Sequence, residues 1–260
     1  MKRKLLCGLL AAAALCLPAK AARPTAVQVD GQLLKTTAYV ADGTTYAPLR
    51  DLLNAMGDWT IWWDRSTATA RAASGGASLS ADPGGNTLTV NGQRYACTVN
   101  VEEGCTYVPL RLITEALGGS VCWDRWLDGA AVTSAGARYD ARDYYWLSHI
   151  IYAESGGEEL EGQIAVGNVV LNRVASPDFP DSITEVIFDM ENGVQFEPVA
   201  NRTVLNQPTE LSQEAARRVL EGENTAGDSL YFFAPALSEG TWIDSNRSYL
   251  QTIGCHRFYQ

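Results

Sequence analysis

Hydrophobic and polar positions follow two different periods along this chain, and the period changes near residue 140. Before that point, short runs of alternating apolar and polar residues are separated by turn sequences, which predicts strands joined by tight turns. After it, apolar residues recur every three or four positions over long stretches, as they do on one face of an α-helix. We therefore expect a β-rich domain over residues 26–134 and a mostly helical domain over residues 140–260.

The first region contains a duplication. Asp30-Gly31-Gln32 matches Asn91-Gly92-Gln93, and Tyr46-Ala47-Pro48-Leu49-Arg50 matches Tyr107-Val108-Pro109-Leu110-Arg111, both with an offset of 61 residues. Further on, Trp63-Asp64-Arg65 matches Trp123-Asp124-Arg125 with an offset of 60 residues. Each copy predicts a hairpin, a short helix that begins near a proline and ends at Gly57 or Gly118, and a second hairpin.

This duplicated unit resembles the copper amine oxidase N-terminal-domain-like repeat, a stalk module of many secreted bacterial proteins. The resemblance is carried by Tyr-x-Pro-Leu-Arg in both copies, and it implies no copper site, because residues 26–134 contain no histidine. Two interpretations of the region stay open, a wall-binding module and a plain spacer. We interpret Arg50 and Arg111 as structural hydrogen-bond donors rather than ligand contacts.

The second region predicts an α+β domain, mostly helical with a small late sheet. Helices are expected over residues 143–155, 160–174 and 210–220, and the second of these is apolar almost all round, so it should be the buried centre. Ser182-x-x-Glu185 predicts a capping box that begins a short helix through Phe188. Residues 191–207 are interpreted as a loop, and residues 229–233 and 255–259 as strands with Trp242 in the loop region between them.

Glu154 continues the apolar stripe of the first of these helices. Leu147, Ile150, Ile151 and Glu154 are spaced by three, four and seven residues, which places them on one helix face. A carboxyl group held against an apolar face loses hydration, so its pKa rises and it can donate a proton near neutral pH. The alternative is that Glu154 ends the helix, because Ser155-Gly156-Gly157 follow it.

Several blocks around and after Glu154 resemble the spore-cortex-lytic (SleB-type) cell-wall hydrolase family. They are Ala153-Glu154-x-x-Gly157-Glu158, Glu161-Gly162-Gln163-x-Ala165-Val166, Val170-Leu171-Asn172-Arg173, Gln195-Phe196-x-Pro198-Val199, Leu230-Tyr231-Phe232, Trp242-Ile243 and Ile253-Gly254-x-His256-x-Phe258. The resemblance implies a lysozyme-like domain that cleaves the glycan strands of peptidoglycan, in spore cortex or cell wall, with Glu154 as the catalytic acid.

The resemblance favours a lytic transglycosylase, in which one carboxyl group serves first as acid and then as base. A hydrolase usually needs a second carboxylate, and Glu158 and Glu161 are the candidates for it. We interpret Glu158 as an organiser of the site. The other candidate substrate contacts are Asn172 on the central helix, Gln195 and Phe196 on a loop, Tyr231 and Trp242 as stacking platforms, and His256 as a polar contact.

The N-terminus predicts export. A basic head, an apolar run over residues 5–17 and Ala19-x-Ala21 indicate a signal peptide over residues 1–21. The apolar run is shorter than the roughly 20 residues that span a bilayer, so we expect no membrane attachment after cleavage and a secreted protein in the envelope or spore cortex region. The net charge of -10 argues against nucleic acid as a partner, and peptidoglycan is the expected partner.

The cysteines and histidines limit which disulfides and metal sites the chain can form. Four cysteines follow the signal peptide, and one disulfide is expected among Cys97, Cys105 and Cys122, with Cys255 unpaired. Their spacing is unlike a zinc site, so we expect no metal and no cofactor. Two alternatives remain, a wall-binding protein without catalysis and a metal-dependent amidase built on His149 and His256.

Overall fold

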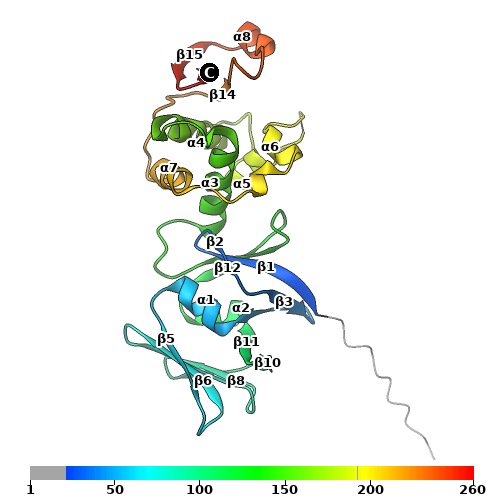
Figure 1. Ribbon diagram of the computed structural model, residues 1–260, viewed down its shortest axis with the longest axis vertical. Coiled ribbons are helices and arrows are strands. Elements are labelled where there is room, and N and C mark those ends of the chain that lie inside the picture. Colours follow the sequence, from blue (N-terminus) through cyan, green and yellow to red (C-terminus); the bar gives the residue numbers. More distant parts are fainter. Residues whose placement is uncertain (1–21, 192) are drawn as a thin grey trace, which may run out of the picture.

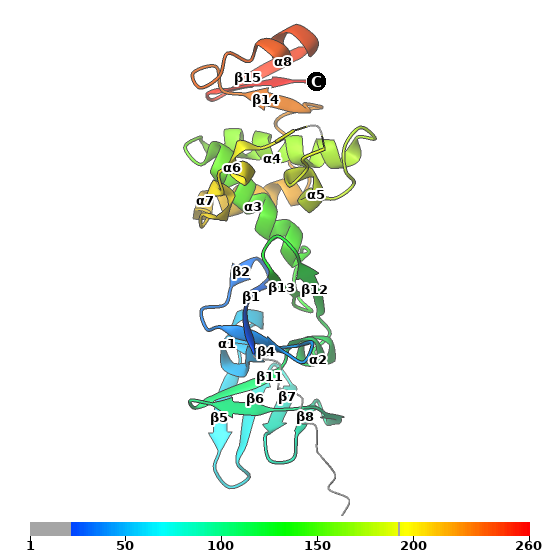
Figure 2. The same cartoon turned by 90° about the vertical axis from the view of Figure 1, so that its right-hand side faces the viewer.

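The computed structural model describes residues 22–191 and 193–260, in three parts that follow one another along the long axis of the molecule (Figures 1 and 2). A β-rich part spans residues 23–133, a helical part spans residues 141–220, and a terminal sheet with one further helix spans residues 231–259. The α+β class predicted from the sequence is confirmed. The predicted signal peptide, residues 1–21, lies outside the described residues.

The β-rich part contains both copies of the repeat. The first consists of β1 (Arg23–Val29), β2 (Gln32–Leu33), β3 (Ala38–Ala41), β4 (Thr44–Pro48), α1 (Leu49–Met56), β5 (Thr60–Asp64) and β6 (Thr69–Ser74). After the connecting strand β7 (Ala77–Asp82), the second consists of β8 (Thr87–Val90), β9 (Gln93–Ala96), β10 (Asn100–Glu102), β11 (Cys105–Pro109), α2 (Leu110–Ala116), β12 (Ser120–Asp124) and β13 (Gly129–Thr133).

The predicted hairpin turns are confirmed. At Asp30-Gly31 the φ angles are 49° and 87°, and at Asn91-Gly92 they are 49° and 83°. Each turn joins an antiparallel pair, β1 with β2 and β8 with β9. A two-residue type I′ turn needs positive φ at both central residues, which Asp, Asn and Gly adopt more readily than other residues.

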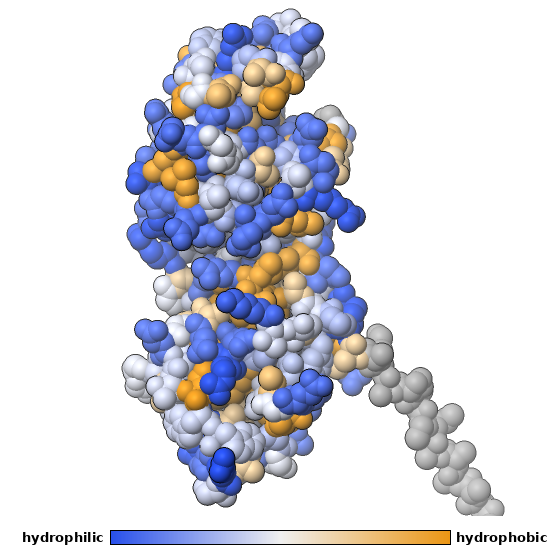
Figure 3. Space-filling view, in the orientation of Figure 1, coloured by the Kyte–Doolittle hydropathy of each residue, from blue (hydrophilic) through white to orange (hydrophobic). Residues whose placement is uncertain are grey.

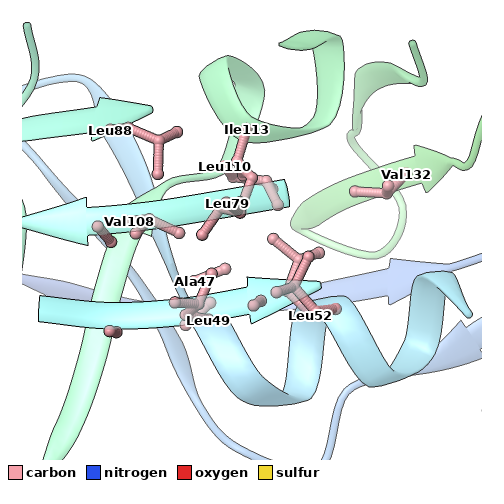
Figure 4. Close-up of a cluster of buried hydrophobic side chains, with 14 of the residues drawn as sticks. Ala47, Leu49, Leu52, Leu79, Leu88, Val108, Leu110, Ile113 and Val132 are labelled. Carbon is pink, nitrogen blue, oxygen red and sulfur yellow. The ribbon is translucent and has the colours of Figure 1, made fainter. Parts of the chain in front are cut away.

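The two copies are interleaved into one fold. In the larger sheet β4 pairs with β11, β1 pairs in parallel with β13, and the order is β10-β11-β4-β3-β1-β13-β12 with β2 beside β1. The other sheet has the order β5-β6-β7-β8-β9. Side chains from both copies fill one core, in which Leu52 of α1 and Ile113 of α2 are fully buried (Figure 4). Neither copy therefore has a core of its own.

The predicted disulfide among Cys97, Cys105 and Cys122 is wrong, because all three are free thiols. Cys105 begins β11 and Cys122 lies in β12, and four strands of the larger sheet stand between them. Neighbouring strands are about 4.8 Å apart, whereas a disulfide bridges Cα atoms up to about 7 Å apart. Cys97 follows β9 in the other sheet. Cys255 is also free, as predicted.

The helical part surrounds one buried helix. Its elements are α3 (Ala141–Ser155), α4 (Leu160–Ala175), α5 (Ile183–Ile187), α6 (Glu197–Ala200), a 3₁₀ turn (Thr203–Leu205) and α7 (Glu210–Leu220). Residues 162–170 of α4 are all buried, which confirms this helix as the centre. Asp140 caps α3 by accepting the N–H groups of Arg142 and Asp143, so α3 begins two residues before its predicted start.

Two short helices occupy the region after α4. The Ser182 hydroxyl accepts the N–H of Glu185 at the start of α5, as the predicted capping box requires. By contrast, the segment interpreted as a loop over residues 191–207 contains α6 and the 3₁₀ turn. Pro198 stands in the first turn of α6, where its missing N–H costs no helical hydrogen bond.

The terminal sheet has the order β14 (Tyr231–Phe233), β16 (His256–Tyr259), β15 (Tyr249–Ile253), and α8 (Thr241–Asn246) precedes β15. The two predicted strands are confirmed as β14 and β16. Strand β15 was not predicted, and Trp242 lies on α8 rather than in a loop. Neither α8 nor β15 contains a buried residue, so neither produces an apolar period in the sequence.

The β-rich and helical parts meet at a narrowing where hydrophobic residues gather (Figure 3). The Trp126 ring, from the turn after β12, stacks on Phe188 with a centroid distance of 4.2 Å. Leu127 packs against the core of the helical part, and Gly31 lies so close to the Tyr144 ring that a Cβ there would come within 2.4 Å of it.

Within the described residues, no helix is both long enough and apolar enough to cross a membrane.

Candidate active site

Glu154 lies in the last turn of α3, where the buried face of the helix reaches the surface. Leu147, Ile150 and Ile151, its neighbours on this face, are fully buried, and Glu154 itself is half-buried. The pKa of the Glu154 carboxyl is raised from 4.5 to about 7, mainly by burial and secondly by the charge of Glu197, while Arg173 offsets part of the rise. Near pH 7 this carboxyl group is therefore present in both protonation states.

An open hollow of about 460 Å³ gives access to Glu154. It is lined by Tyr152, Ala153, Glu154, Gly156, Gly157, Thr203 and Asn206, from the end of α3 and from the chain around the 3₁₀ turn. A Cβ at Gly156 would lie 2.6 Å from the Tyr152 carbonyl oxygen and 2.7 Å from its ring. The hollow thus depends on a glycine at this position.

Arg173, in the last turn of α4, is a buried cation next to Glu154. Its Nε donates a hydrogen bond of 2.8 Å to the Leu230 carbonyl oxygen. Its guanidinium carbon lies 4.9, 5.1 and 5.5 Å from the ring centroids of Phe179, Phe196 and Tyr231. Burial lowers the pKa of Arg173 to about 10, so it remains charged at neutral pH. Arg173 belongs to the block Val170-Leu171-Asn172-Arg173 that carries the family resemblance, but it was not among the predicted site residues.

Glu197, the first residue of α6, is the acid that acts on Glu154. It was not predicted, although it occupies the variable position of Gln195-Phe196-x-Pro198-Val199. The signal that could have identified it was an acidic residue on a surface segment, inside a block that carries the family resemblance. Glu158 and Glu161, the candidates for a second carboxylate if one were needed, are not among the groups that shift the pKa of Glu154.

Glu158 instead fastens the terminal sheet to the start of α4. Its Oε2 accepts the Cys255 N–H at 3.1 Å, and its Oε1 lies 3.7 Å from His256 Nδ1. Glu161 is exposed in the first turn of α4. This geometry supports the interpretation of Glu158 as an organiser and gives no support to either acid as a partner of Glu154.

Tyr231 and Trp242 form an aromatic surface next to Arg173. Their rings meet edge to face at 6.2 Å, and Arg247 lies over both, 4.4 Å from the Tyr231 centroid and 5.2 Å from the Trp242 centroid. Arg247 also donates a 2.8 Å hydrogen bond to the Tyr231 hydroxyl. The Trp242 side chain is exposed. The structure therefore brings Tyr231 and Trp242 together and places Tyr231 against Arg173, whose charge lowers the pKa of Glu154. Neither ring lines the hollow at Glu154.

Gln195 and Phe196 are adjacent in the chain but differ in burial. Gln195 is half-buried before α6, and its side chain donates to the Gly193 carbonyl oxygen at 3.4 Å. Phe196, expected as a substrate contact on a loop, is instead buried in the core of the helical part, where its ring packs against Arg173. A contact of its ring with substrate is excluded by this burial, and its effect on the site is through Arg173.

Asn172 and His256 have structural contacts. The Asn172 amide donates to the carbonyl oxygens of Gly227 and Ser229, at 2.7 and 2.9 Å. His256 is buried with its ring 5.4 Å from that of Phe232. Burial lowers the pKa of His256, and Glu158 offsets part of this. Both side chains hold the segment after α7 and the terminal sheet against the helical part.

The pair of histidines considered for an amidase does not form one site. The buried His149 places Nδ1 2.9 Å from the Val204 carbonyl oxygen, among Tyr145 and Trp146, while His256 lies beside Glu158. Across residues 22–191 and 193–260, no three His, Cys, Asp or Glu side chains are grouped as a metal site would require.

Two families match this chain. Residues 157–259 match the family described as Cell Wall Hydrolase, and residues 28–127 match the Copper amine oxidase N-terminal domain. Glu154 lies three residues before the first match begins. The β-rich part thus matches the Copper amine oxidase N-terminal domain, and most of the remaining chain matches the Cell Wall Hydrolase family.

Similar proteins include spore cortex-lytic enzymes. That of Halalkalibacterium halodurans is 35% identical over 126 residues, which is 48% of this chain and 37% of the relative. That of Bacillus subtilis is 34% identical over 131 residues, 50% of this chain and 41% of the relative. The chain thus spans about two fifths of the length of these curated relatives.

A shorter relative is matched over most of its length. Cell wall hydrolase CwlJ of Halalkalibacterium halodurans is 33% identical over 104 residues, 38% of this chain and 71% of the relative. Among solved structures, the catalytic domain of the germination-specific lytic transglycosylase SleB from Bacillus anthracis is 33% identical, covering 47% of this chain and 98% of that domain, with a TM-score of 0.43.

Proposed function

Since the chain belongs to the cell wall hydrolase family, we propose that it cleaves the glycan strands of peptidoglycan as a lytic transglycosylase, in spore cortex or cell wall, with Glu154 as general acid and base. One observation carries the proposal. Glu154 is a carboxyl group at an open hollow, and burial raises its pKa to about 7, near the working pH at which a group can both donate and accept a proton.

The proposed reaction uses one carboxyl group twice. Protonated Glu154 gives its proton to the glycosidic oxygen as the bond from that oxygen to C1 breaks. The C6 hydroxyl oxygen of the same sugar then bonds to C1, and its proton passes to the Glu154 carboxylate. The products are a free hydroxyl on the leaving sugar and a 1,6-anhydro ring, and Glu154 regains its proton without consumption of water.

Two neighbours of Glu154 each favour one of the protonation states that these two roles require. Glu197 raises the pKa and so favours the acid form before cleavage, whereas Arg173 favours the carboxylate that forms during it. Trp242 and Tyr231 offer ring faces and edges on which sugar rings can pack. Arg247 lies over both rings, and Tyr231 also contacts Arg173, the cation that acts on Glu154.

We also propose the organisation expected from the sequence. Residues 1–21 direct export, residues 26–134 form the stalk domain, and residues 140–260 carry catalysis. The comparisons support the second and third of these by matching two separate families over residues 28–127 and 157–259. The protein would then act outside the cell membrane, in the envelope or the spore cortex region.

Product analysis tests the function. Purified cortex and vegetative peptidoglycan are digested with the wild-type chain, Glu154→Gln and the control Glu161→Gln, and sugar ends are identified by mass spectrometry. We expect 1,6-anhydromuramic acid ends, a loss of about 10²–10⁴-fold in Glu154→Gln, and little change in Glu161→Gln.

Other products would assign another function. Reducing muramic acid ends would indicate hydrolysis, and Glu197 would be the first residue to test as the second carboxylate. Intact glycan with released peptides would indicate an amidase. Binding without products by the wild-type chain would indicate a wall-binding protein.

A further inference from the structure

Two exposed tryptophans of the first copy line a cavity whose other walls include residues of the second copy. It has a volume of about 370 Å³ and lies between the start of α1, strand β5 and the turn before β11. Trp62 and Trp63 of β5 form part of its wall and are 43% and 45% exposed. Indole rings left this open to water in a sheet, beside a cavity, leave apolar ring surface available to a ligand.

A free cation stands at the same cavity. Arg50, the second residue of α1, was interpreted from the sequence as a structural hydrogen-bond donor, but in the structure it lines this cavity and is exposed. Its counterpart in the second copy, Arg111, is held in place, since it donates to the Val121 carbonyl oxygen at 2.9 Å and pairs with Glu115 at 3.3 Å. The residue four positions after Arg50 is Asn54 rather than an acid. Within the described part of the chain, no carboxylate forms an ion pair with Arg50.

Polar groups complete the wall. Asp51 and Thr36 both line the cavity, and the Thr36 hydroxyl donates a hydrogen bond to the Asp51 carboxylate. Asp51 thus keeps a second oxygen with which it can accept a ligand hydroxyl or amide. The cavity combines exposed indole surface, one unpaired guanidinium and one carboxylate acceptor.

These groups match the chemistry of a carboxylate-bearing amino-sugar strand. A pyranose ring presents an apolar C–H face to an aromatic ring and hydroxyl or amide groups at its rim. A guanidinium binds a carboxylate through two parallel hydrogen bonds. The whole chain has a net charge of -10, so bulk electrostatics does not attract it to an anionic wall, and attachment requires a local cation such as Arg50.

We propose that this cavity, the Trp62 cavity, binds peptidoglycan, with an indole ring of β5, from Trp62 or Trp63, packed on a sugar ring and Arg50 paired with a carboxylate of the strand or of its stem peptide. The Trp62 cavity belongs to the β-rich part and does not include Glu154, so wall binding and cleavage are separate properties of the chain.

The two copies of the repeat have diverged in agreement with this assignment. Trp62 of the first copy corresponds to Cys122 of the second, and the free Arg50 to the bound Arg111. In the second copy, Trp126 faces the helical part instead, where it stacks on Phe188. Trp62 and Trp63 of the first copy are thus open to solvent, whereas Trp126 of the second copy packs in the junction.

Sedimentation with insoluble peptidoglycan tests the proposal. The chain carries Glu154→Gln so that the ligand stays intact, and it is compared with the same chain bearing Trp62→Ala/Trp63→Ala or Arg50→Gln. We expect the Kd to rise at least tenfold for the tryptophan pair and about three- to tenfold for Arg50→Gln. Trp123→Ala is the matched control, because Trp123 is a β12 tryptophan with 44% exposure, and we expect less than a twofold change.

Two ligand controls identify the carboxylate. Peptidoglycan with its carboxyl groups converted to amides, and uncharged N-acetylglucosamine oligomers, should bind more weakly and should be insensitive to Arg50→Gln. Circular dichroism melting of each variant separates loss of binding from loss of fold. Wild-type affinity in a folded Trp62→Ala/Trp63→Ala chain would overturn the proposal, and equal binding of the amidated wall would overturn the role of Arg50.

Cleavage assays keep this proposal distinct from the function proposed for Glu154. With Glu154 restored, Trp62→Ala/Trp63→Ala should cleave soluble glycan fragments at the wild-type rate and insoluble wall more slowly. If the wild-type chain cleaves nothing, the proposed function fails, while the sedimentation result still decides the Trp62 cavity.

Discussion

The indole N–H of Trp146 donates a hydrogen bond of 2.5 Å to the carboxylate of Asp124, across the junction between the helical part and the β-rich part. Both residues are almost fully buried. The other Asp124 oxygen accepts the N–H groups of Trp126 and Leu127, in the turn after β12. One buried carboxylate therefore shapes this turn and fastens it to α3.

The matching position in the first copy shows what is specific to this junction. Asp64 also accepts from the turn that follows it, through the N–H and hydroxyl of Ser66. Where the first copy has Ser66-Thr67, however, the second has Trp126-Leu127. The same aspartate-centred turn is thus polar in one copy and carries the hydrophobic contacts of the junction in the other.

Replacing the junction side chains with those of the first copy should destabilise the protein. Trp126→Ser/Leu127→Thr removes the stacking on Phe188 and the packing of Leu127, and we expect the free energy of unfolding to fall by about 2–4 kcal/mol. Chemical denaturation followed by circular dichroism measures this. The reverse exchange, Ser66→Trp/Thr67→Leu, has no partner to contact and should change the stability by less than about 0.5 kcal/mol.

The contacts of Trp126 and Asp124 with the helical part also predict how removal of the β-rich part affects stability. A chain of residues 138–260 lacks Trp126 and Asp124, so Phe188 and the indole of Trp146 become exposed. We expect this fragment to melt at a lower temperature than the full chain, even though the matched hydrolase blocks are intact. Equal melting temperatures would show that the junction contributes little.

Glu154→Gln should make the protein more stable at neutral and alkaline pH. The pKa of Glu154 is raised from 4.5 to about 7 in the folded protein, so the unfolded chain ionises first and stability is lost as pH rises from about 4.5 through 7. A difference of about 2.5 pKa units corresponds to at most about 3 kcal/mol. Thermal melts of the wild-type chain and of Glu154→Gln at pH 4 and pH 8 measure this difference in stability. An equal gain at both pH values would show that ionisation of Glu154 is not its cause.

The neighbours of Glu154 should shift its titration in opposite directions. Glu197→Gln removes a negative charge, so the pKa of Glu154 falls and the alkaline limit of kcat/KM moves to lower pH. Arg173→Gln removes a positive charge and should move this limit to higher pH. Profiles of kcat/KM against pH measure both, with Arg173→Lys as the charge-retaining control and Glu161→Gln as the control for an exposed acid. Shifts of the same sign in both variants would refute the assignment.

Export should remove the predicted signal peptide. The basic head, the apolar run and Ala19-x-Ala21 place the cleavage after Ala21, so secreted protein should begin at Ala22. N-terminal sequencing of the protein from the culture medium or the spore fraction measures this. Recovery of the chain with Met1 intact from the cytoplasm would contradict it.

Elements whose residues carry a local signal were predictable from the sequence. The Asp30-Gly31 turn was predictable because few residue pairs adopt positive φ twice in succession. Helix α4 was predictable because it is buried on all sides, and α5 because Ser182 and Glu185 cap it locally. Glu154 was identifiable because a carboxyl group on the stripe of Ile150 and Ile151 breaks a helical period.

Contacts between residues far apart in the chain were not predictable in this way. Glu197 and Arg173 act on Glu154 from other helices, and no local spacing contains that information. Phe196 lies in the core rather than at the surface because α6 turns its ring onto Arg173. The separation of Cys105 from Cys122 follows from strand order, which interleaves the two copies. Sequence periodicity reports how each segment is buried, whereas the partners of a buried side chain are set by how the segments pack.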